Sequence, residues 1–114
     1  MLCPKIHRQR VSIEFHTNKN LYDADYVVSL FDNFLHDLCG TLRMESILDP
    51  VTKHVEDGSS SYMMWKESGV QVHSWFAHKF VTVDIYSCKP FLVSDALDVI
   101  EYWFDPIILE VEIY

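Results

Sequence analysis

Hydrophobic and polar residues alternate with two different periods along this chain, and each period predicts one kind of element. Residues 11–16 alternate strictly between apolar and polar side chains, which predicts a strand with one buried face. Apolar residues then recur at every third or fourth position from Asp23 to about Cys39. This pattern predicts a helix that Asp23 caps and Gly40 ends. Residues 42–55 show neither period clearly, and we interpret them as an interrupted strand.

The second half of the chain is rich in β-branched and aromatic residues, which favour strands. A turn is predicted at Gly58 and the serines after it. Three strand-like segments follow, over residues 61–67, 70–76 and 79–88. The apolar spacing then predicts a second helix, capped by Ser94 and ended by Asp105. Residues 107–114 alternate again and predict an edge strand with an acidic exposed face.

This order of elements predicts an α+β two-layer sandwich. We expect a mostly antiparallel sheet that two helices cover on one face. The 114 residues suffice for one core, so we expect a single domain over residues 1–114. The second face of the sheet has no helix to cover it and is expected to face a partner, a substrate or water.

Charge, cysteine spacing and histidine spacing disfavour several classes of function. The formal net charge of −8 argues against a nucleic-acid partner, which selects basic surfaces, and it suits cationic small molecules. No apolar run approaches the ~18 residues of a membrane span, so we expect a cytoplasmic protein with no membrane partner. Cys3, Cys39 and Cys88 form no CxxC pair, and the histidines lack the spacing of ligands on one element. We therefore expect neither a disulfide framework nor a metal site.

Four residues of the second half are candidates for a reactive site: Ser60, Ser68, His73 and Cys88. A hairpin near Ser68-Gly69 would fold His73 back toward Ser68, and Cys88 would lie at the end of a neighbouring strand. Each residue also has an ordinary interpretation. The serines suit a solvated turn, His73 suits a hydrogen-bonded position in a sheet, and Cys88 suits a small buried site.

The spacing of these residues resembles a motif of the bacterial and archaeal S-adenosylmethionine decarboxylases, which are pyruvoyl enzymes made as self-cleaving proenzymes. The resemblance covers about residues 57–90. Four segments carry it: Gly58-Ser59-Ser60, Glu67-Ser68-Gly69, His73-Ser74-Trp75-Phe76-Ala77 and Val83-Asp84-Ile85-Tyr86-Ser87-Cys88. All four candidate positions fall at the spacing of that family.

The resemblance implies a specific chemistry for these positions. Ser68 would attack the carbonyl group of Glu67, cut the chain between the two residues and become a covalently bound pyruvoyl group. That group would accept electrons during decarboxylation, so no added cofactor is needed. His73 and Ser60 would assist the self-cleavage, and Cys88 would donate a proton to the substrate.

The resemblance also implies partners and substrate contacts. The substrate would be S-adenosylmethionine, the pathway polyamine (spermidine) synthesis, and the assembly a homodimer with active sites at or near its interface. Trp75 is a candidate to contact a cationic substrate through its ring face. Glu14 and Phe15 on the first strand are further candidates for contact with the substrate.

Three positions depart from the family pattern. Ala77 stands where the family has a glutamate that binds the ribose hydroxyls, and Phe76 stands where it has proline. Gly69 replaces the histidine that follows the cleavage-site serine. Ala77 favours a sister decarboxylase that acts on a basic amino acid such as arginine or ornithine. Gly69 favours an inactive member that only binds and regulates a partner.

Overall fold

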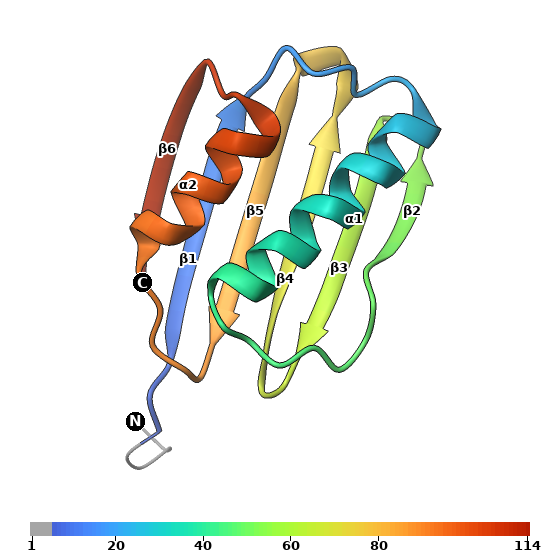
Figure 1. The fold of residues 1–114 in the computed structure, drawn as a ribbon. Helices are drawn as coiled ribbons and strands as arrows, with labels where there is room; N and C mark the ends of the chain where they lie inside the picture. Colours follow the sequence, from blue (N-terminus) through green and yellow to red (C-terminus); the bar gives the residue numbers. More distant parts are fainter. Residues whose placement is uncertain (1–5) are drawn as a thin grey trace.

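Six antiparallel strands form one sheet in the computed structural model, which describes residues 6–114 (Figure 1). The sheet has the order β2-β3-β4-β5-β1-β6, and every pair of neighbours is antiparallel. The strands are β1 (Gln9–His16), β2 (Val51–Val55), β3 (Gly58–Trp65), β4 (Ser68–Trp75), β5 (Phe80–Ser87) and β6 (Ile108–Ile113). The helices are α1 (Ala24–Thr41), α2 (Val93–Phe104) and the short 3-10 helix η1 (Phe76–His78), which joins β4 to β5. Helices α1 and α2 cover the same face of the sheet (Figure 1), so the expected α+β sandwich is confirmed.

The core fills the space between the sheet and the two helices. Strand β1 contributes Val11, Ile13 and Phe15, which are at most 2% exposed. The ring of Phe104, the last residue of α2, lies 5.0 Å from that of Phe15 and 4.9 Å from that of Phe34 on α1. Because burial of one such side chain stabilises the fold by roughly 1.5–3 kcal/mol, this aromatic cluster holds both helices against β1.

The opposite face of the sheet carries none of the described helices (Figure 1). Alternation along the strands places large side chains there that stay partly in water. Tyr62, Met64 and Trp75 are 44%, 43% and 37% exposed. The expected uncovered face is therefore present, and we call it the open face.

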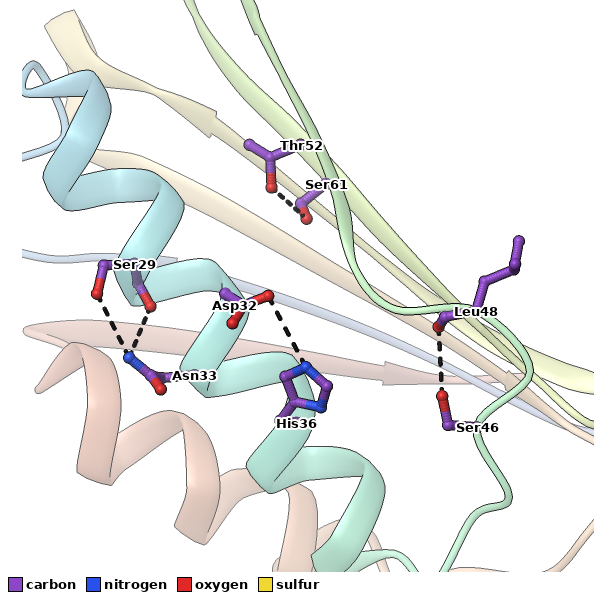
Figure 2. A network of polar contacts seen from close by, with 8 residues as sticks. All are labelled: Ser29, Asp32, Asn33, His36, Ser46, Leu48, Thr52 and Ser61. Carbon is purple, nitrogen blue, oxygen red and sulfur yellow. Dashed lines mark hydrogen bonds and ion pairs between the residues drawn. The ribbon is translucent and has the colours of Figure 1, made fainter.

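Polar groups replace the apolar core where the sheet reaches its β2 edge. The hydroxyl groups of Thr52 on β2 and Ser61 on β3 lie 2.9 Å apart and share a hydrogen bond. Figure 2 shows this pair together with Asp32 and His36 of α1, whose carboxylate oxygen and Nε2 atom lie 3.8 Å apart. The buried hydroxyl group of Ser61 has a partner, so the core ends at this edge in a polar layer without an unsatisfied group on Ser61.

Most predicted elements are confirmed within a few residues. Asp23 caps α1, because its side chain accepts a hydrogen bond of 3.1 Å from the backbone N–H of Tyr26. The helix then runs one residue past Gly40, to Thr41. Asp105 ends α2 in the left-handed conformation, with φ of 45°. The final alternating segment forms β6, an edge strand as expected.

Two predicted boundaries are wrong, each for a local reason. Gly58 does not form a turn but is the first residue of β3, and the chain turns at residues 56–57. A Cβ atom at Gly58 would lie 1.7 Å from the carbonyl oxygen of Ser74, so the close approach of two strands requires glycine there. Ser94 does not cap α2, because the helix already begins at Val93 and has no side-chain cap.

Candidate functional site

The structure brings Ser68 and Cys88 together at one end of the sheet. Ser68 is the first residue of β4, and Cys88 directly follows β5, the antiparallel neighbour of β4. The backbone N–H of Cys88 donates a hydrogen bond of 3.1 Å to the Oγ atom of Ser68. The same Oγ atom donates a longer hydrogen bond of 3.4 Å to Ser87. The serine hydroxyl group is therefore held beside the cysteine.

The residue before Ser68 has an unusual backbone conformation. Glu67 lies in the two-residue turn between β3 and β4, where Trp65 and Ser68 are paired. Its φ angle is 56°, in the left-handed region that costs a residue with a Cβ atom about 1–2 kcal/mol. The Glu67–Ser68 peptide bond thus follows a strained residue in a tight turn.

Ser60 and His73 form a second pair, on the open face. They stand opposite each other on β3 and β4, and the Oγ atom of Ser60 lies 2.7 Å from Nδ1 of His73. The other ring nitrogen of His73 lies 3.3 Å from Oε1 of Gln71. Partners on both nitrogens fix the plane of the ring on the open face.

The two pairs do not converge within one chain, and the expectation that a hairpin would bring His73 back to Ser68 is wrong. The hairpin turns at Lys66 and Glu67, so Ser68 and His73 lie on the same strand, five residues apart. At about 3.4 Å per residue their Cα atoms are separated by about 17 Å. An odd separation also sends their side chains to opposite faces of the sheet. Within one chain, His73 cannot reach the hydroxyl group of Ser68.

A groove of about 660 Å³ opens on the open face beside Ser68. Met64, Gly69 and Tyr86 stand in one row across β3, β4 and β5 and line it. Gly69 has no side chain to fill the space between the other two. Asp84, in the next row of β5, adds a carboxylate to the wall of the groove. The site therefore combines a serine, a cysteine and a mixed polar and aromatic surface large enough for a small molecule.

A contact that we did not predict from the sequence joins Tyr86 to Cys88. The thiol of Cys88 lies 3.6 Å from the phenolic oxygen of Tyr86, within hydrogen-bonding range for sulfur. The guanidinium carbon of Arg10 lies 5.3 Å from the centre of the Tyr86 ring, in the range of a cation–π interaction. The pKa of Tyr86 is raised above its ordinary value, chiefly by its hydrogen bond to Cys88.

The three proposed substrate contacts have different surroundings. Trp75 lies on the open face beside His73, with ring centres 6.3 Å apart, and Glu14 is exposed on the same face of β1. Phe15 points the other way, because it is 1% exposed and packs against Phe104 in the core. The side chain of Phe15, a predicted substrate contact, therefore lies in the core and not on the open face, since neighbouring residues of a strand point to opposite faces.

Within residues 6–114, no group of three or more His, Cys, Asp and Glu side chains is arranged to hold a metal ion. None of the helices in this range combines the length and apolar character that a membrane crossing requires. Among the described cysteines, Cys39 is buried and free, and burial raises its pKa above the ordinary value of 9.0.

Comparisons with known proteins agree with the fold and with the motif. The sequence model of the S-adenosylmethionine decarboxylase family matches residues 9–113. The chain is 34% identical over 83 residues to the S-adenosylmethionine decarboxylase proenzyme of Saccharolobus islandicus strain L.S.2.15, which covers 62% of this chain and 61% of that relative. It is 38% identical over 45 residues to the proenzyme of the same name from Saccharolobus solfataricus, over 40% of this chain and 36% of the relative. The matches thus span about three fifths or less of these relatives.

One solved structure has the same fold. The adenosylmethionine decarboxylase from Aquifex aeolicus VF5 superposes on this chain with a TM-score of 0.75, over 96% of this chain and 90% of that one. At 18% sequence identity, this match shows a shared fold alone.

Proposed function

Because the chain belongs to the S-adenosylmethionine decarboxylase family, we propose that it cuts itself between Glu67 and Ser68 and then decarboxylates S-adenosylmethionine. The product would be the aminopropyl donor for spermidine synthesis in the cytoplasm, and residues 1–114 would act as one decarboxylase domain. One observation carries this proposal. Ser68 follows a strained turn residue, and its Oγ atom is held by the N–H of Cys88 at the edge of the groove.

The self-cleavage uses the hydroxyl group of Ser68 as an internal nucleophile. Its Oγ atom adds to the carbonyl carbon of Glu67, and the C–N bond to residue 68 then breaks. The hydroxyl proton passes to the freed amine, so an ester replaces the amide. A base next removes the α-proton of residue 68, and the electron pair expels the carboxylate of Glu67 from the β-carbon. The chain is now cut, and hydrolysis of the new N-terminal residue releases ammonia and leaves a pyruvoyl group.

The surroundings of Ser68 fit such a group. Ser68 is half-buried, lines the groove and is followed by Gly69, which leaves the groove unobstructed. The group supplies an electrophilic carbonyl that takes up the electron pair freed when carbon dioxide leaves. Cys88, whose backbone N–H contacts Ser68, would give a thiol proton to the substrate carbon. On the open face, the ring of Trp75 and the carboxylate of Glu14 would contact a cationic substrate.

A homodimer would supply the missing base. His73 lies about 17 Å from Ser68 in one chain, and it faces away from the helices. A second copy packed on the open face in the opposite direction would bring its own Ser60–His73 pair over the groove, next to the backbone of residue 68, whose hydroxyl group points to the other face. The exposed Tyr62, Met64 and Trp75 of this face suit burial in such an interface. We therefore assign Ser60 and His73 to the cleavage site of the partner.

Mixed dimers test this arrangement. His73→Ala and Ser68→Ala chains with different tags are produced separately and together, and the cleavage of each chain is read by mass spectrometry. Each variant alone is expected to stay whole. In mixed dimers the His73→Ala chain is expected to be cut, because its Ser68 meets an intact His73, while the Ser68→Ala chain stays whole.

A His36→Ala chain is the matched control, since His36 is an exposed histidine on α1. It should be cut on its own at the rate of the unmodified chain. Absence of cut His73→Ala chain in mixed dimers contradicts the shared site, and so does cleavage of the His73→Ala chain alone.

Release of labelled carbon dioxide identifies the substrate. Carboxyl-labelled S-adenosylmethionine, arginine and ornithine are supplied to the cleaved protein and to the Ser68→Ala control. We expect release from S-adenosylmethionine. Because Ala77 cannot accept a hydrogen bond from ribose, release from arginine or ornithine alone would replace this assignment with the sister enzyme. No release from a cleaved protein would favour an inactive member that binds and regulates a partner.

A further inference from the structure

A line of four contacting residues runs along the wall of the groove. The guanidinium group of Arg10 lies over the ring of Tyr86 at 5.3 Å, and the hydroxyl group of Tyr86 meets the thiol of Cys88 at 3.6 Å. The backbone N–H of Cys88 in turn donates to Ser68 at 3.1 Å. Arg10, Ser68 and Tyr86 all line the groove. The proposed cleavage and the proposed proton donation use Ser68 and Cys88, but they leave Tyr86 without a role.

The hydroxyl group of a tyrosine can keep this contact in both states of the thiol. A phenol has one O–H donor and lone pairs that accept, so it accepts from the S–H of Cys88 and donates to the sulfur once the proton has gone. A hydrogen bond to a charged partner is stronger than one between neutral groups. The phenol of Tyr86 therefore interacts more strongly with the thiolate than with the thiol.

We propose that Tyr86 is a positioning residue for the proton donation by Cys88. While the thiol is protonated, the hydroxyl group of Tyr86 holds it beside residue 68. When Cys88 gives its proton to the substrate, the S–H bond breaks, a C–H bond forms at the carbon that lost carbon dioxide, and the electron pair stays on sulfur. The hydroxyl group then donates to that thiolate until water returns a proton. This role rests on the proposed decarboxylation.

The surroundings of Tyr86 support the assignment. The cation of Arg10 over its ring restrains the ring at the groove wall, which limits the motion of the hydroxyl group. The pKa of the phenol is raised, first by the hydrogen bond to Cys88, while Arg8 and Arg10 act in the opposite direction. The phenol therefore stays protonated, and able to donate, at neutral pH.

Tyr86→Phe tests this role, because it removes one oxygen atom and leaves the ring under Arg10. Tyr102→Phe is the matched control, since Tyr102 is an exposed tyrosine on α2 and does not line the groove. Three quantities are compared: the fraction of chain cut, kcat and KM for decarboxylation, and the rate at which iodoacetamide alkylates Cys88 at pH 7.5. Peptide mapping separates Cys88 from the other two cysteines. Alkylation needs neither cleavage nor substrate.

We expect Tyr86→Phe to be cut normally and to keep KM within about twofold, while kcat falls about tenfold, as loss of a hydrogen bond to a charged group predicts. Alkylation of Cys88 should also slow severalfold, because the thiolate is the reacting form. Tyr102→Phe should match the unmodified chain in kcat and alkylation. Equal alkylation in both variants overturns the contact itself. Loss of cleavage in Tyr86→Phe, or a rise in KM at constant kcat, overturns the role. If the unmodified chain shows no decarboxylation, the proposed function fails while the alkylation rates still decide whether Tyr86 acts on Cys88.

Discussion

The strained turn before Ser68 makes a quantitative prediction about self-cleavage. Glu67 holds φ at 56°, a conformation that glycine adopts freely and alanine does not. Glu67→Gly and Glu67→Ala both remove the carboxylate, but only the glycine relieves the strain. The difference between the two variants therefore isolates the backbone term from any effect of the side chain.

The size of the effect follows from the cost of the conformation. A left-handed residue with a Cβ atom costs about 1–2 kcal/mol. We take the strain energy of residue 67 as about 1.5 kcal/mol, of which half or all is released when Ser68 adds to the carbonyl carbon of residue 67. The activation barrier of self-cleavage is then lower by about 0.7–1.5 kcal/mol in the alanine variant than in the glycine variant. At about 1.36 kcal/mol for each factor of ten, Glu67→Gly should be cut about three- to tenfold more slowly than Glu67→Ala.

The assay follows the loss of whole chain after refolding from denaturant, by gel and intact mass. A Ser68→Ala background, which cannot be cut, measures the strain independently. There the glycine should raise the unfolding free energy over the alanine by about 0.5–1 kcal/mol, because its greater freedom in the unfolded chain offsets part of the gain. That corresponds to a Tm higher by about 2–5 °C. If the glycine chain is more stable but cleaves as fast as the alanine chain, the strain exists and plays no part in cleavage.

Further predictions concern stability. Gly58→Ala should unfold most of the β3–β4 pairing, because its Cβ atom would lie 1.7 Å from the carbonyl oxygen of Ser74. A Cβ atom at Gly40, inside α1, meets nothing within 4 Å, so Gly40→Ala should stabilise the fold by about 0.5–1 kcal/mol. Urea unfolding of both variants measures these changes. Because burial raises the pKa of Cys39, the folded state holds its thiol proton longer than the unfolded state. Stability should therefore fall as pH rises above about 9.0, and Cys39→Ala should flatten the fall of Tm between pH 8 and 10.

The elements could be predicted where one physical signal dominated. Strict alternation marked β1 and β6, and the side chain of Asp23 marked the start of α1. The prediction of a turn at Gly58 was wrong because glycine is typical both of turns and of places where two backbones approach closely. Only the nearby carbonyl group of Ser74 shows that Gly58 belongs to the second kind. Such a contact joins residues far apart in sequence, so no local pattern contains it.

The candidate site was only partly accessible to sequence reasoning. The pairing of Ser60 with His73 follows from strand spacing once the turn between β3 and β4 is known, whereas the contact of Ser68 with Cys88 depends on the register between β4 and β5. That turn lies at residues 66–67, where Lys66 and Glu67 carry none of the usual turn signals, so the hairpin was placed two residues too late. On a strand a shift of register changes which residues share a face and which meet across it.

The contact between Tyr86 and Cys88 could have been predicted from the sequence. The two residues have the same parity at the end of β5, which places them on one side of the strand. The position of Arg10 over the Tyr86 ring could not be predicted in this way, because Arg10 lies on β1, which is far from β5 in the sequence and pairs with it only in the fold.

The intact mass of the purified chain, measured beside a Ser68→Ala control, tests the central claim most directly. Self-cleavage predicts two fragments: one ends at Glu67, and the other begins at residue 68 and is lighter by one ammonia than simple hydrolysis would leave it. The control should keep a single uncut mass. One uncut mass for both chains, under conditions in which both are folded dimers, would contradict the account.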